Sequence, residues 1–256
     1  MREIPRQEEH PIPDMGAKTS DVFAGKGESE TNREVYGETA KLFADQIRER
    51  LPVRGEPYTI ADIGSFQGEL MNNIIQLLPE YKFDTIAIDI NEEALFKNTA
   101  VKKIVAKAED LPFKDGSVDV AIMRYVLQWN NAEKQQEILK EIVRTIKNFA
   151  LIEHVGADTF ETEKWRKRLD DLFDGQEVPK MKRGEHFFSS EDEVEKWMQQ
   201  SNIAFDKLKD KRIENGMDVY IERYGLDEED AKKSREIMGD KNYFIQTDWV
   251  IYPKNK

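Results

Sequence analysis

The segment IADIGSFQGEL, residues 60–70, is the first part of the chain whose residue types and spacing suggest chemistry. An apolar run ends at Asp62 and passes Gly64 and Gly68, after which the pattern becomes helical. A strand that enters a helix through a glycine turn directs backbone amides and the positive end of the helix dipole toward the carboxyl edge of a sheet, where open α/β proteins bind ligands. The turn therefore predicts a ligand-binding loop with exposed amides, although glycines also occur in purely structural turns.

A second acidic residue follows this turn at the spacing of a nucleoside-binding site. Asp89, in the run IAIDIN, lies at the end of the next apolar run. An acid about twenty residues beyond a glycine turn accepts hydrogen bonds from the hydroxyls of a ribose. The alternative is that Asp89 only caps the helix that follows it. Together, the turn and Asp89 favour a cofactor that contains a nucleoside.

Composition excludes several other kinds of chemistry. The 256 residues include no cysteine, which excludes a disulfide framework, a thiolate zinc site and a cysteine nucleophile. The 39 basic and 51 acidic residues give a net charge of -12, which repels phosphate backbones, so no nucleic-acid partner is expected. The first residues contain no apolar signal region, and no stretch approaches the roughly 18 apolar residues of a membrane span. We therefore expect a cytoplasmic protein with no membrane partner.

The rest of the chain must supply the elements that position these residues. Short apolar runs alternate with amphipathic segments, which is typical of strands joined by helical crossovers. The first five strands are predicted at residues 58–64, 83–90, 102–107, 118–124 and 149–155. The helices are predicted from residue 31 to Pro52, at 68–78, near 92–98 and at 132–147. Parallel neighbours need crossovers that cover both faces of the sheet. The pattern thus predicts an α/β fold with a doubly wound sheet.

The ends of the chain and two interruptions complete the predicted organisation. Residues 1–30 are polar and contain several prolines and glycines, and we expect a flexible arm there. One domain is predicted over residues 31–256, with a core at 55–156, a lid insertion at 157–188 and a second helical insertion at 214–242. Ser190 and Glu193 have the spacing of a capping box, and two final strands are predicted in residues 203–213 and 242–253.

The segment AKAEDLPFKDGSVDVAIMRYVLQW, residues 106–129, resembles the run through the third and fourth strands of the class I S-adenosylmethionine-dependent methyltransferases. In that family an Ala-Glu-x-Leu-Pro-Phe turn borders the adenine. The glycine turn is likewise similar to the family's Asp-x-Gly-x-Gly-x-Gly motif, not to the Gly-x-Gly-x-x-Gly motif of dehydrogenases. Four motifs occur in the family's order over about residues 35–155. The resemblance implies S-adenosylmethionine as cofactor, S-adenosylhomocysteine as product, and a Rossmann-like, seven-stranded, mostly parallel sheet with helical lid insertions.

The resemblance also implies which residues contact the cofactor. Those around the methionine moiety are Asp62, Gly64, Ser65 and Gly68, and those around the ribose and adenine are Asp89, Ile90, Lys107, Ala108 and Glu109. Arg124, at the end of the fourth strand, would face the sulfonium.

Two residues depart from the family's pattern. Phe66 stands where the family has the middle glycine of the turn. A phenylalanine at positive φ would be strained, so we expect a turn that avoids this conformation and aims the side chain elsewhere, for example into the acceptor pocket. Lys107 stands where many relatives have Asp or Asn, and it cannot accept a hydrogen bond from the adenine amino group. Glu109 or a backbone carbonyl would replace that contact.

The segment YVLQWNN suggests the class of acceptor. It resembles the methyltransferases that esterify carboxylates, such as the trans-aconitate and malonyl-thioester enzymes, and more broadly the ubiquinone and menaquinone biosynthesis type. This favours a small-molecule acceptor methylated on a carboxylate or hydroxyl oxygen, although Trp129 could equally pack the start of its helix. The candidate pocket residues are Tyr36, Phe66, Trp129, Trp165 and His186. No further ligand accompanies His186 at metal-binding spacing, so no metal is expected.

His154, at the end of the fifth strand, is the candidate general base because the unperturbed pKa of histidine lies near neutrality. The alternative is a structural role. An ionised carboxylate acceptor would need no base.

Three alternative functions stay open. The substitution at Phe66 suggests a protein that binds the cofactor without catalysis. A nucleic-acid or protein methyltransferase is less favoured, because MRYV replaces the Asn/Asp-Pro-Pro-aromatic motif of amine-methylating enzymes after the fourth strand. The glycine spacing argues against a nicotinamide oxidoreductase. The sequence gives no oligomeric state.

Overall fold

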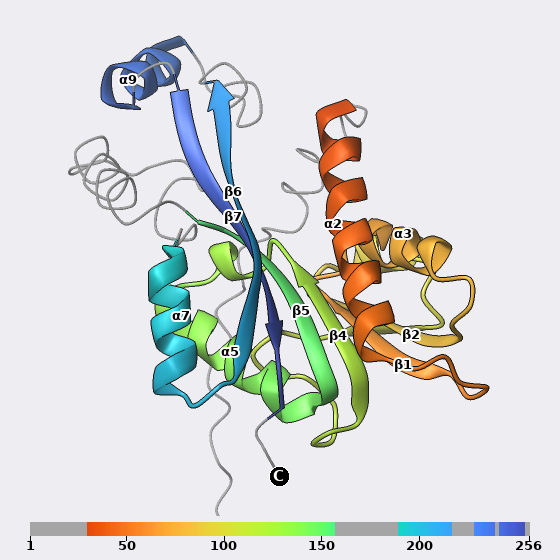
Figure 1. The fold of residues 1–256 in the computed structure, drawn as a ribbon. Helices are drawn as coiled ribbons and strands as arrows, with labels where there is room; N and C mark the ends of the chain where they lie inside the picture. Colours follow the sequence, from red (N-terminus) through yellow and green to blue (C-terminus); the bar gives the residue numbers. More distant parts are fainter. Residues whose placement is uncertain (1–29, 157–188, 217–227, 239–240, 254–256) are drawn as a thin grey trace, which may run out of the picture.

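The computed structural model describes residues 30–156, 189–216, 228–238 and 241–253 (Figure 1). The arm predicted at 1–30 falls outside the described residues except for its last residue, and so does the whole lid predicted at 157–188. The second insertion, predicted at 214–242, is described only in part.

One seven-stranded sheet forms the centre of the fold. Its strands are β1 (Tyr58–Ile63), β2 (Phe83–Asp89), β3 (Lys102–Val105), β4 (Val118–Arg124), β5 (Ile146–Gly156), β6 (Phe205–Gly216) and β7 (Lys241–Ile251). They lie in the order β3-β2-β1-β4-β5-β7-β6. The pairs formed among β1 to β5 are parallel, and β7 is antiparallel to both β5 and β6. The predicted doubly wound, mostly parallel sheet is confirmed.

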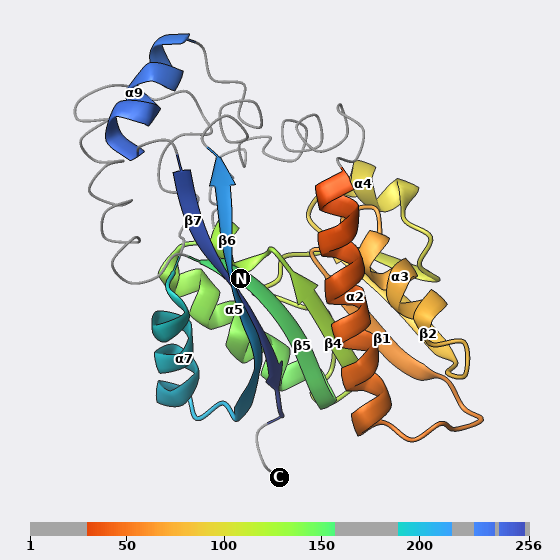
Figure 2. The same cartoon turned by 45° about the horizontal axis from the view of Figure 1, so that its top comes forward.

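Helices cover both faces of this sheet (Figure 2). They are α2 (Glu30–Arg50), α3 (Glu69–Leu77), α4 (Glu92–Lys97), α5 (Ala132–Thr145), α7 (Glu191–Gln200) and α9 (Glu228–Met238), with a 3-10 turn η1 (Leu127–Trp129). The apolar side chains of α2 and α3 pack on one face and those of α5 and α7 on the other. Figure 1 shows α9 at the far end of the β6–β7 hairpin.

Alternation along the strands decides which side chain reaches which face. In β1, Ile60 packs toward α2 and α3, whereas Ala61 and Ile63 pack toward α5. Asp62 therefore points toward the α2 face, since successive side chains alternate. The same rule places Arg124 and Glu153 on that face, because their neighbours Met123 and Ile152 belong to the α5 cluster. Three ionisable side chains thus gather on one side of three adjacent strands.

Local signals account for most element boundaries. The five predicted core strands are all present, and only β3 and β5 differ from their predicted ends by more than one residue. The helix α7 begins at the predicted capping box, in which the Ser190 hydroxyl accepts from the Glu193 amide and the Glu193 side chain accepts from the Ser190 amide. The strand β5 starts earlier than predicted, at Ile146, directly after α5 ends at Thr145.

Candidate functional site

The candidate site lies where the strand order reverses. β1 is flanked by β2 on one side and β4 on the other, which is the switch point at which open α/β sheets bind ligands. The loops that follow β1 and β4 contain Phe66, at φ 46°, and Tyr125, at φ 56°. Non-glycine residues in this region are strained by about 1–3 kcal/mol and cluster at functional sites. Backbone strain and topology therefore indicate the same edge.

The glycines of the turn after β1 are required by its geometry. Gly64 has φ 71° and Gly68 has φ 90°, both in the left-handed region. A Cβ atom on Gly64 would overlap with the side chain of Val126, and one on Gly68 would lie 2.8 Å from the side-chain amide of Asn98. The turn thus brings its backbone close to two other loops, one after β4 and one after α4.

The prediction that this turn exposes its amides is wrong for four of its residues. The amides of Gly64 and Ser65 donate to the carbonyl of Ile88 at 2.8 and 2.9 Å. The Phe66 amide donates to the Asp89 carboxylate at 2.8 Å, and the Gly68 amide to the Ser65 carbonyl at 2.8 Å. The first three bonds fasten the turn to the end of β2, and the fourth closes the turn on itself. These four amides are therefore engaged, and the groups available to a ligand here are the carboxylates of Asp62 and Asp89.

The expectation that Phe66 avoids positive φ is also wrong. The residue adopts the left-handed conformation itself, at φ 46°. This conformation costs a non-glycine residue about 1–2 kcal/mol. Phe66 is held there because its amide donates to Asp89 and its carbonyl accepts from Asn98 Nδ2 at 3.2 Å. Two tertiary hydrogen bonds therefore impose the turn that the family achieves with glycine.

Asn98 is a site residue that the sequence reasoning missed. Its side chain is 4% exposed and donates to Ser65 Oγ at 3.3 Å as well as to the Phe66 carbonyl. Its Oδ1 accepts from the Ala100 amide at 2.9 Å. The only local signal was an asparagine at the end of a helical pattern, which is typical of an ordinary C-cap.

Asp62 has an unsatisfied buried oxygen. The residue is 3% exposed, and its Oδ2 has no hydrogen-bond partner among the described residues. Burial, with a smaller contribution from the nearby Asp89 and Glu69 carboxylates, raises the pKa of Asp62 to about 8. A buried carboxyl group beside other acids is suited to a cationic ligand group, since a cation supplies the missing partner and stabilises the ionised form.

Asp89 is the anchor of the turn and keeps capacity for a ligand. Its Oδ2 accepts from the Phe66 amide at 2.8 Å and its Oδ1 from the Asn91 amide at 2.9 Å. Burial raises its pKa, whereas these backbone hydrogen bonds act in the opposite direction. Each carboxylate oxygen can accept a second hydrogen bond. The N-cap of α4 is Asn91, whose side chain accepts from the Ala94 amide, so Asp89 is not the cap.

The segments near the ends of β2 and β3 differ in exposure. Ile90 is 61% exposed, although its side chain is large and apolar. Lys107 is exposed, whereas Ala108 and Glu109 are half-buried. Glu109 forms an ion pair with Lys134 on α5, at 3.4 Å. This edge combines an open apolar surface with a loop that is tied to α5, which suits the flat face of a base.

Arg124 is part of a buried polar cluster on the α2 face. Its Nε donates to Glu153 Oε1 at 2.5 Å, its Nη2 donates to the Tyr125 hydroxyl at 3.2 Å, and its guanidinium lies 4.3 Å from the centre of the Tyr125 ring. Glu153 is 0% exposed and also accepts from Gln246 Nε2, at 2.8 Å, and from the Thr39 hydroxyl. The Glu153 charge neutralises Arg124, so a cationic group could approach this side of the site.

Asp248 extends the same cluster. It lies opposite Glu153 in the β5–β7 ladder and is buried. Burial and the charge of Glu153 raise the pKa of Asp248 to about 8. The sequence reasoning missed Glu153, Gln246 and Asp248. The available signal was a charged residue, Glu153 or Asp248, inside each of two largely apolar runs, FALIEHV and FIQTDWV.

His154 has the contacts of a structural residue. It is buried, its Nε2 lies 2.9 Å from the Ser189 carbonyl, and its ring centre lies 6.2 Å from that of Trp249. Burial lowers its pKa to about 4. Because it follows Glu153 in β5, its side chain points to the opposite face of the sheet, under α7. The imidazole is therefore neutral at physiological pH and lies away from the polar cluster.

The remaining pocket candidates fall wholly or partly outside the described residues. Tyr36 lies on α2 and Trp129 in η1, but their side chains are outside the described part, and Trp165 and His186 lie outside it entirely. Within the described ranges no group of three or more His, Asp or Glu side chains is arranged to hold a metal ion. No helix in those ranges is both long and apolar enough to cross a membrane.

Comparison with known proteins agrees with this geometry. Residues 61–151 match the family model described as a methyltransferase domain. No match was found among curated protein sequences. The structure is similar to that of the protein YcgJ from Bacillus subtilis, with a TM-score of 0.61 and 17% sequence identity over 85% of this chain and 99% of the other.

Two further structures have the same fold. A protein from Bacillus halodurans whose structure was described as that of a candidate methyltransferase gives a TM-score of 0.59 and 14% identity over 83% of this chain and 96% of the other. Magnesium protoporphyrin IX methyltransferase from Synechocystis, solved with bound S-adenosylhomocysteine, gives a TM-score of 0.56 and 13% identity over 92% of this chain and 95% of the other. The resemblance that the sequence motifs indicated is confirmed.

Proposed function

We propose that the protein transfers a methyl group from S-adenosylmethionine to an oxygen of a small-molecule acceptor, on the premise that residues 61–151 match a methyltransferase domain and that solved methyltransferases have the same fold. The observation that carries the proposal is the buried Oδ2 of Asp62, which lies near Asp89 at the switch point and has no hydrogen-bond partner in the described part of the chain. A ligand that carries an ammonium and a sulfonium group matches this acidic edge in charge.

The residues present fit the cofactor. Asp62 would accept a hydrogen bond from its ammonium group, because this carboxyl oxygen lacks a partner in the described structure. Asp89 would bind the ribose hydroxyls with the acceptor capacity that the Phe66 and Asn91 amides leave. Ile90, Ala108 and Glu109 would border the adenine. The exposed Lys107 would remain at the rim, where its charge is solvated.

When bound, the cofactor supplies a methyl carbon that its sulfonium has already activated. Transfer of this methyl group to an acceptor oxygen would be a direct displacement, with S-adenosylhomocysteine as the leaving group. The protein needs no covalent nucleophile for this displacement. Its residues hold the two reactants in line, which contributes about 7 kcal/mol or more, and exclude water. The Glu153–Arg124 pair would keep the wall of this pocket free of net positive charge.

We propose a carboxylate as the acceptor group ahead of a hydroxyl. A carboxylate is ionised at neutral pH and requires no general base, which is consistent with the buried position of His154 and its pKa of about 4. The similarity of YVLQWNN to the carboxylate-esterifying group supports the same choice. The proposal also includes a cytoplasmic location, which rests on composition alone.

Two experiments test the proposal. Calorimetry should show stoichiometric binding of S-adenosylhomocysteine, and Asp89→Ala should weaken it by about 100-fold, the effect of losing two hydrogen bonds to a charged acceptor. Unchanged binding in that variant would refute the ribose assignment. Transfer of labelled methyl groups to a panel of carboxylic acids and phenols then identifies the acceptor. Binding without transfer to any member of a broad panel would favour the non-catalytic alternative.

A further inference from the structure

The loop between β3 and β4, residues 106–117, carries part of the proposed adenine edge. Between Val105 and Val118 the chain forms neither helix nor strand. Ala108 and Glu109 lie near its start. A loop without regular backbone hydrogen bonds depends on other elements for its shape. The described contacts show that α5 provides this support.

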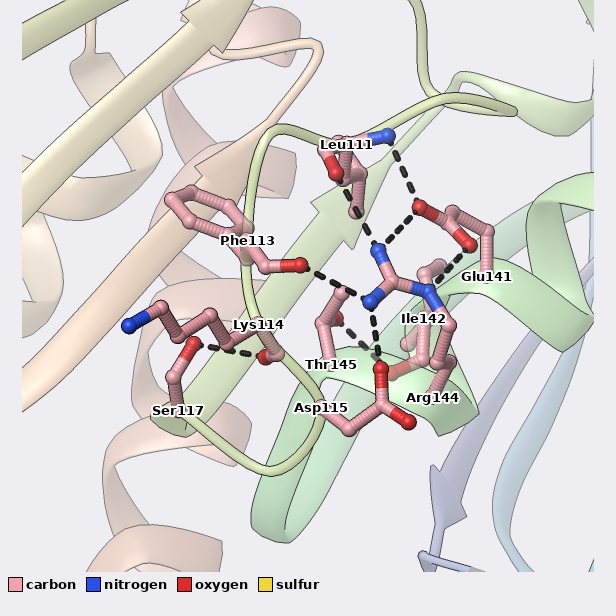
Figure 3. Close-up of polar contacts among 9 residues, drawn as sticks. All are labelled: Leu111, Phe113, Lys114, Asp115, Ser117, Glu141, Ile142, Arg144 and Thr145. Atoms are coloured by element: carbon pink, nitrogen blue, oxygen red, sulfur yellow. Dashed lines mark hydrogen bonds and ion pairs between the residues drawn. The ribbon is translucent and has the colours of Figure 1, made fainter.

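Arg144, in the last turn of α5, holds the loop with all three of its guanidinium nitrogens (Figure 3). Its Nη1 donates to the Phe113 carbonyl at 2.8 Å and to Asp115 Oδ1 at 2.7 Å. Its Nη2 donates to the Leu111 carbonyl at 3.1 Å and to Glu141 Oε1 at 2.6 Å. Its Nε donates to Glu141 Oε2 at 2.8 Å. The five donors of the side chain are therefore all engaged.

Glu141 and the backbone complete this arrangement. Glu141 Oε1 also accepts from the Leu111 amide at 2.9 Å, and the Gly116 amide donates to the Arg144 carbonyl at 2.9 Å. The side chain of Leu111 is buried in the core that α5 shares with the sheet. We call Arg144, Glu141 and Asp115 the Arg144 clamp. Only a planar arginine fork can satisfy two carbonyls and two carboxylates at once, because lysine has a single nitrogen.

The clamp acts on the loop from a fixed support. α5 packs on the sheet with four fully or almost fully buried aliphatic residues, Ile138, Leu139, Ile142 and Val143. Near its N-terminus the same helix pairs with Glu109 through Lys134. The helix therefore holds the loop at both ends, close to Ala108 and close to β4.

We propose that Arg144 is a positioning residue for the adenine end of the cofactor site, and that with Glu141 it fixes the loop in its binding conformation before the cofactor arrives. This inference rests on the proposed function. Arg144 itself touches no reacting atom. A loop that must be ordered during binding loses conformational freedom at that step, whereas a loop held in advance does not.

The test compares two ligands and two arginines by calorimetry. Methylthioadenosine has the adenosine part of S-adenosylhomocysteine but lacks the amino-acid part. Arg144→Gln should weaken binding of both ligands by the same factor, about tenfold. Arg48→Gln is the matched control, because Arg48 also bonds a carboxylate, Glu80, and a carbonyl, that of Leu77, but on the α2–α3 side. It should change neither affinity by more than about twofold.

Hydrogen exchange separates a local effect from a loss of folding. In Arg144→Gln the amides of Leu111 and Gly116 should exchange faster while those of β1 and β4 keep their protection. If that variant does not fold, Asp115→Asn provides the milder version, since its side chain is 82% exposed and supplies one bond. It should weaken both ligands by about threefold.

The outcomes are distinct. Wild-type affinities in Arg144→Gln, or a loss for S-adenosylhomocysteine alone, would overturn the positioning role while leaving the proposed function intact. If the wild-type protein binds neither ligand, the proposed function is wrong, and the cofactor role of the clamp is wrong with it. Faster exchange without any change in affinity would also overturn the role, because it would show that loop order does not matter for binding.

Discussion

Binding of the cofactor should expel a proton from Asp62. Burial, followed by the Asp89 and Glu69 charges, raises the pKa of this carboxyl group to about 8. At pH 7 the group is therefore about 90% protonated in the free protein. An ammonium group beside Oδ2 favours the ionised form and returns the pKa toward its ordinary range. Binding at pH 7 should then release about 0.9 proton, and at pH 9 only about 0.1.

Calorimetry measures this proton directly. S-adenosylhomocysteine is titrated at pH 7 in buffers with different enthalpies of ionisation, and the slope of the observed enthalpy against the buffer enthalpy gives the number of protons. The affinity should also rise with pH, by about 50-fold between pH 6 and pH 8, because only the ionised carboxylate binds the cation.

Two variants make the measurement specific. Asp62→Asn should bind more weakly and release no proton. Glu80→Gln, an acid-to-amide change at an exposed ion pair with Arg48, should bind and release like the wild type. A slope near zero at pH 7 in the wild type, or the same slope in Asp62→Asn, would refute the assignment of Asp62 to the ammonium group.

Three further predictions concern stability, measured by urea unfolding. Phe66→Gly removes left-handed strain of about 1 kcal/mol but increases the entropy of the unfolded chain, so its free energy of unfolding should stay within about 0.5 kcal/mol of wild type. Gly68→Ala, at φ 90°, should lower the free energy of unfolding by more than about 1 kcal/mol. Equal losses in the two variants would contradict the turn geometry. Glu153→Gln leaves Arg124 buried without its counter-charge and should cost about 3–5 kcal/mol, and the double variant with Arg124→Met should recover part of this loss. His154, with its pKa lowered to about 4, is protonated more readily in the unfolded chain than in the folded one, so wild-type stability should fall as the pH is lowered from 6.5 to 4. His154→Phe should lack this dependence. A pH profile of stability that is the same in wild type and His154→Phe would contradict the buried neutral imidazole.

The sequence was sufficient to predict the fold because its signals are local. Apolar runs, glycine turns and capping residues each depend on a few neighbouring positions. Together they define the alternating strands and helices from which the parallel arrangement of β1 to β5 follows. Local signals of the same kind led us to propose the cofactor edge, since Asp62 and Asp89 both lie at or next to strand ends. What local signals could not provide was the set of partners. Glu153 bonds Thr39, which is 114 residues away, and no pattern within β5 indicates that contact.

Phe66 and His154 show two different limits of local sequence signals. The intrinsic backbone preference of phenylalanine argued against positive φ. The hydrogen bonds of the Phe66 backbone with the Asp89 and Asn98 side chains outweigh this preference, which is about 1–2 kcal/mol. His154 was placed correctly at the end of β5, and alternation separates its face from that of Glu153. Which of the two faces carries the polar cluster depends on α2 and β7, and a single strand contains no information about them.

The two loops that we propose to bind the cofactor are supported in the same way. The turn after β1 is held by the end of β2 and by Asn98, which follows α4. The loop after β3 is held by α5, which comes after β4. Each loop thus takes its shape from elements later in the chain, not from the strand that leads into it. The affinity for a ligand that contacts both loops therefore depends on α4 and α5 as well. Substitutions in these helices should change cofactor affinity even where the substituted residue does not contact the cofactor.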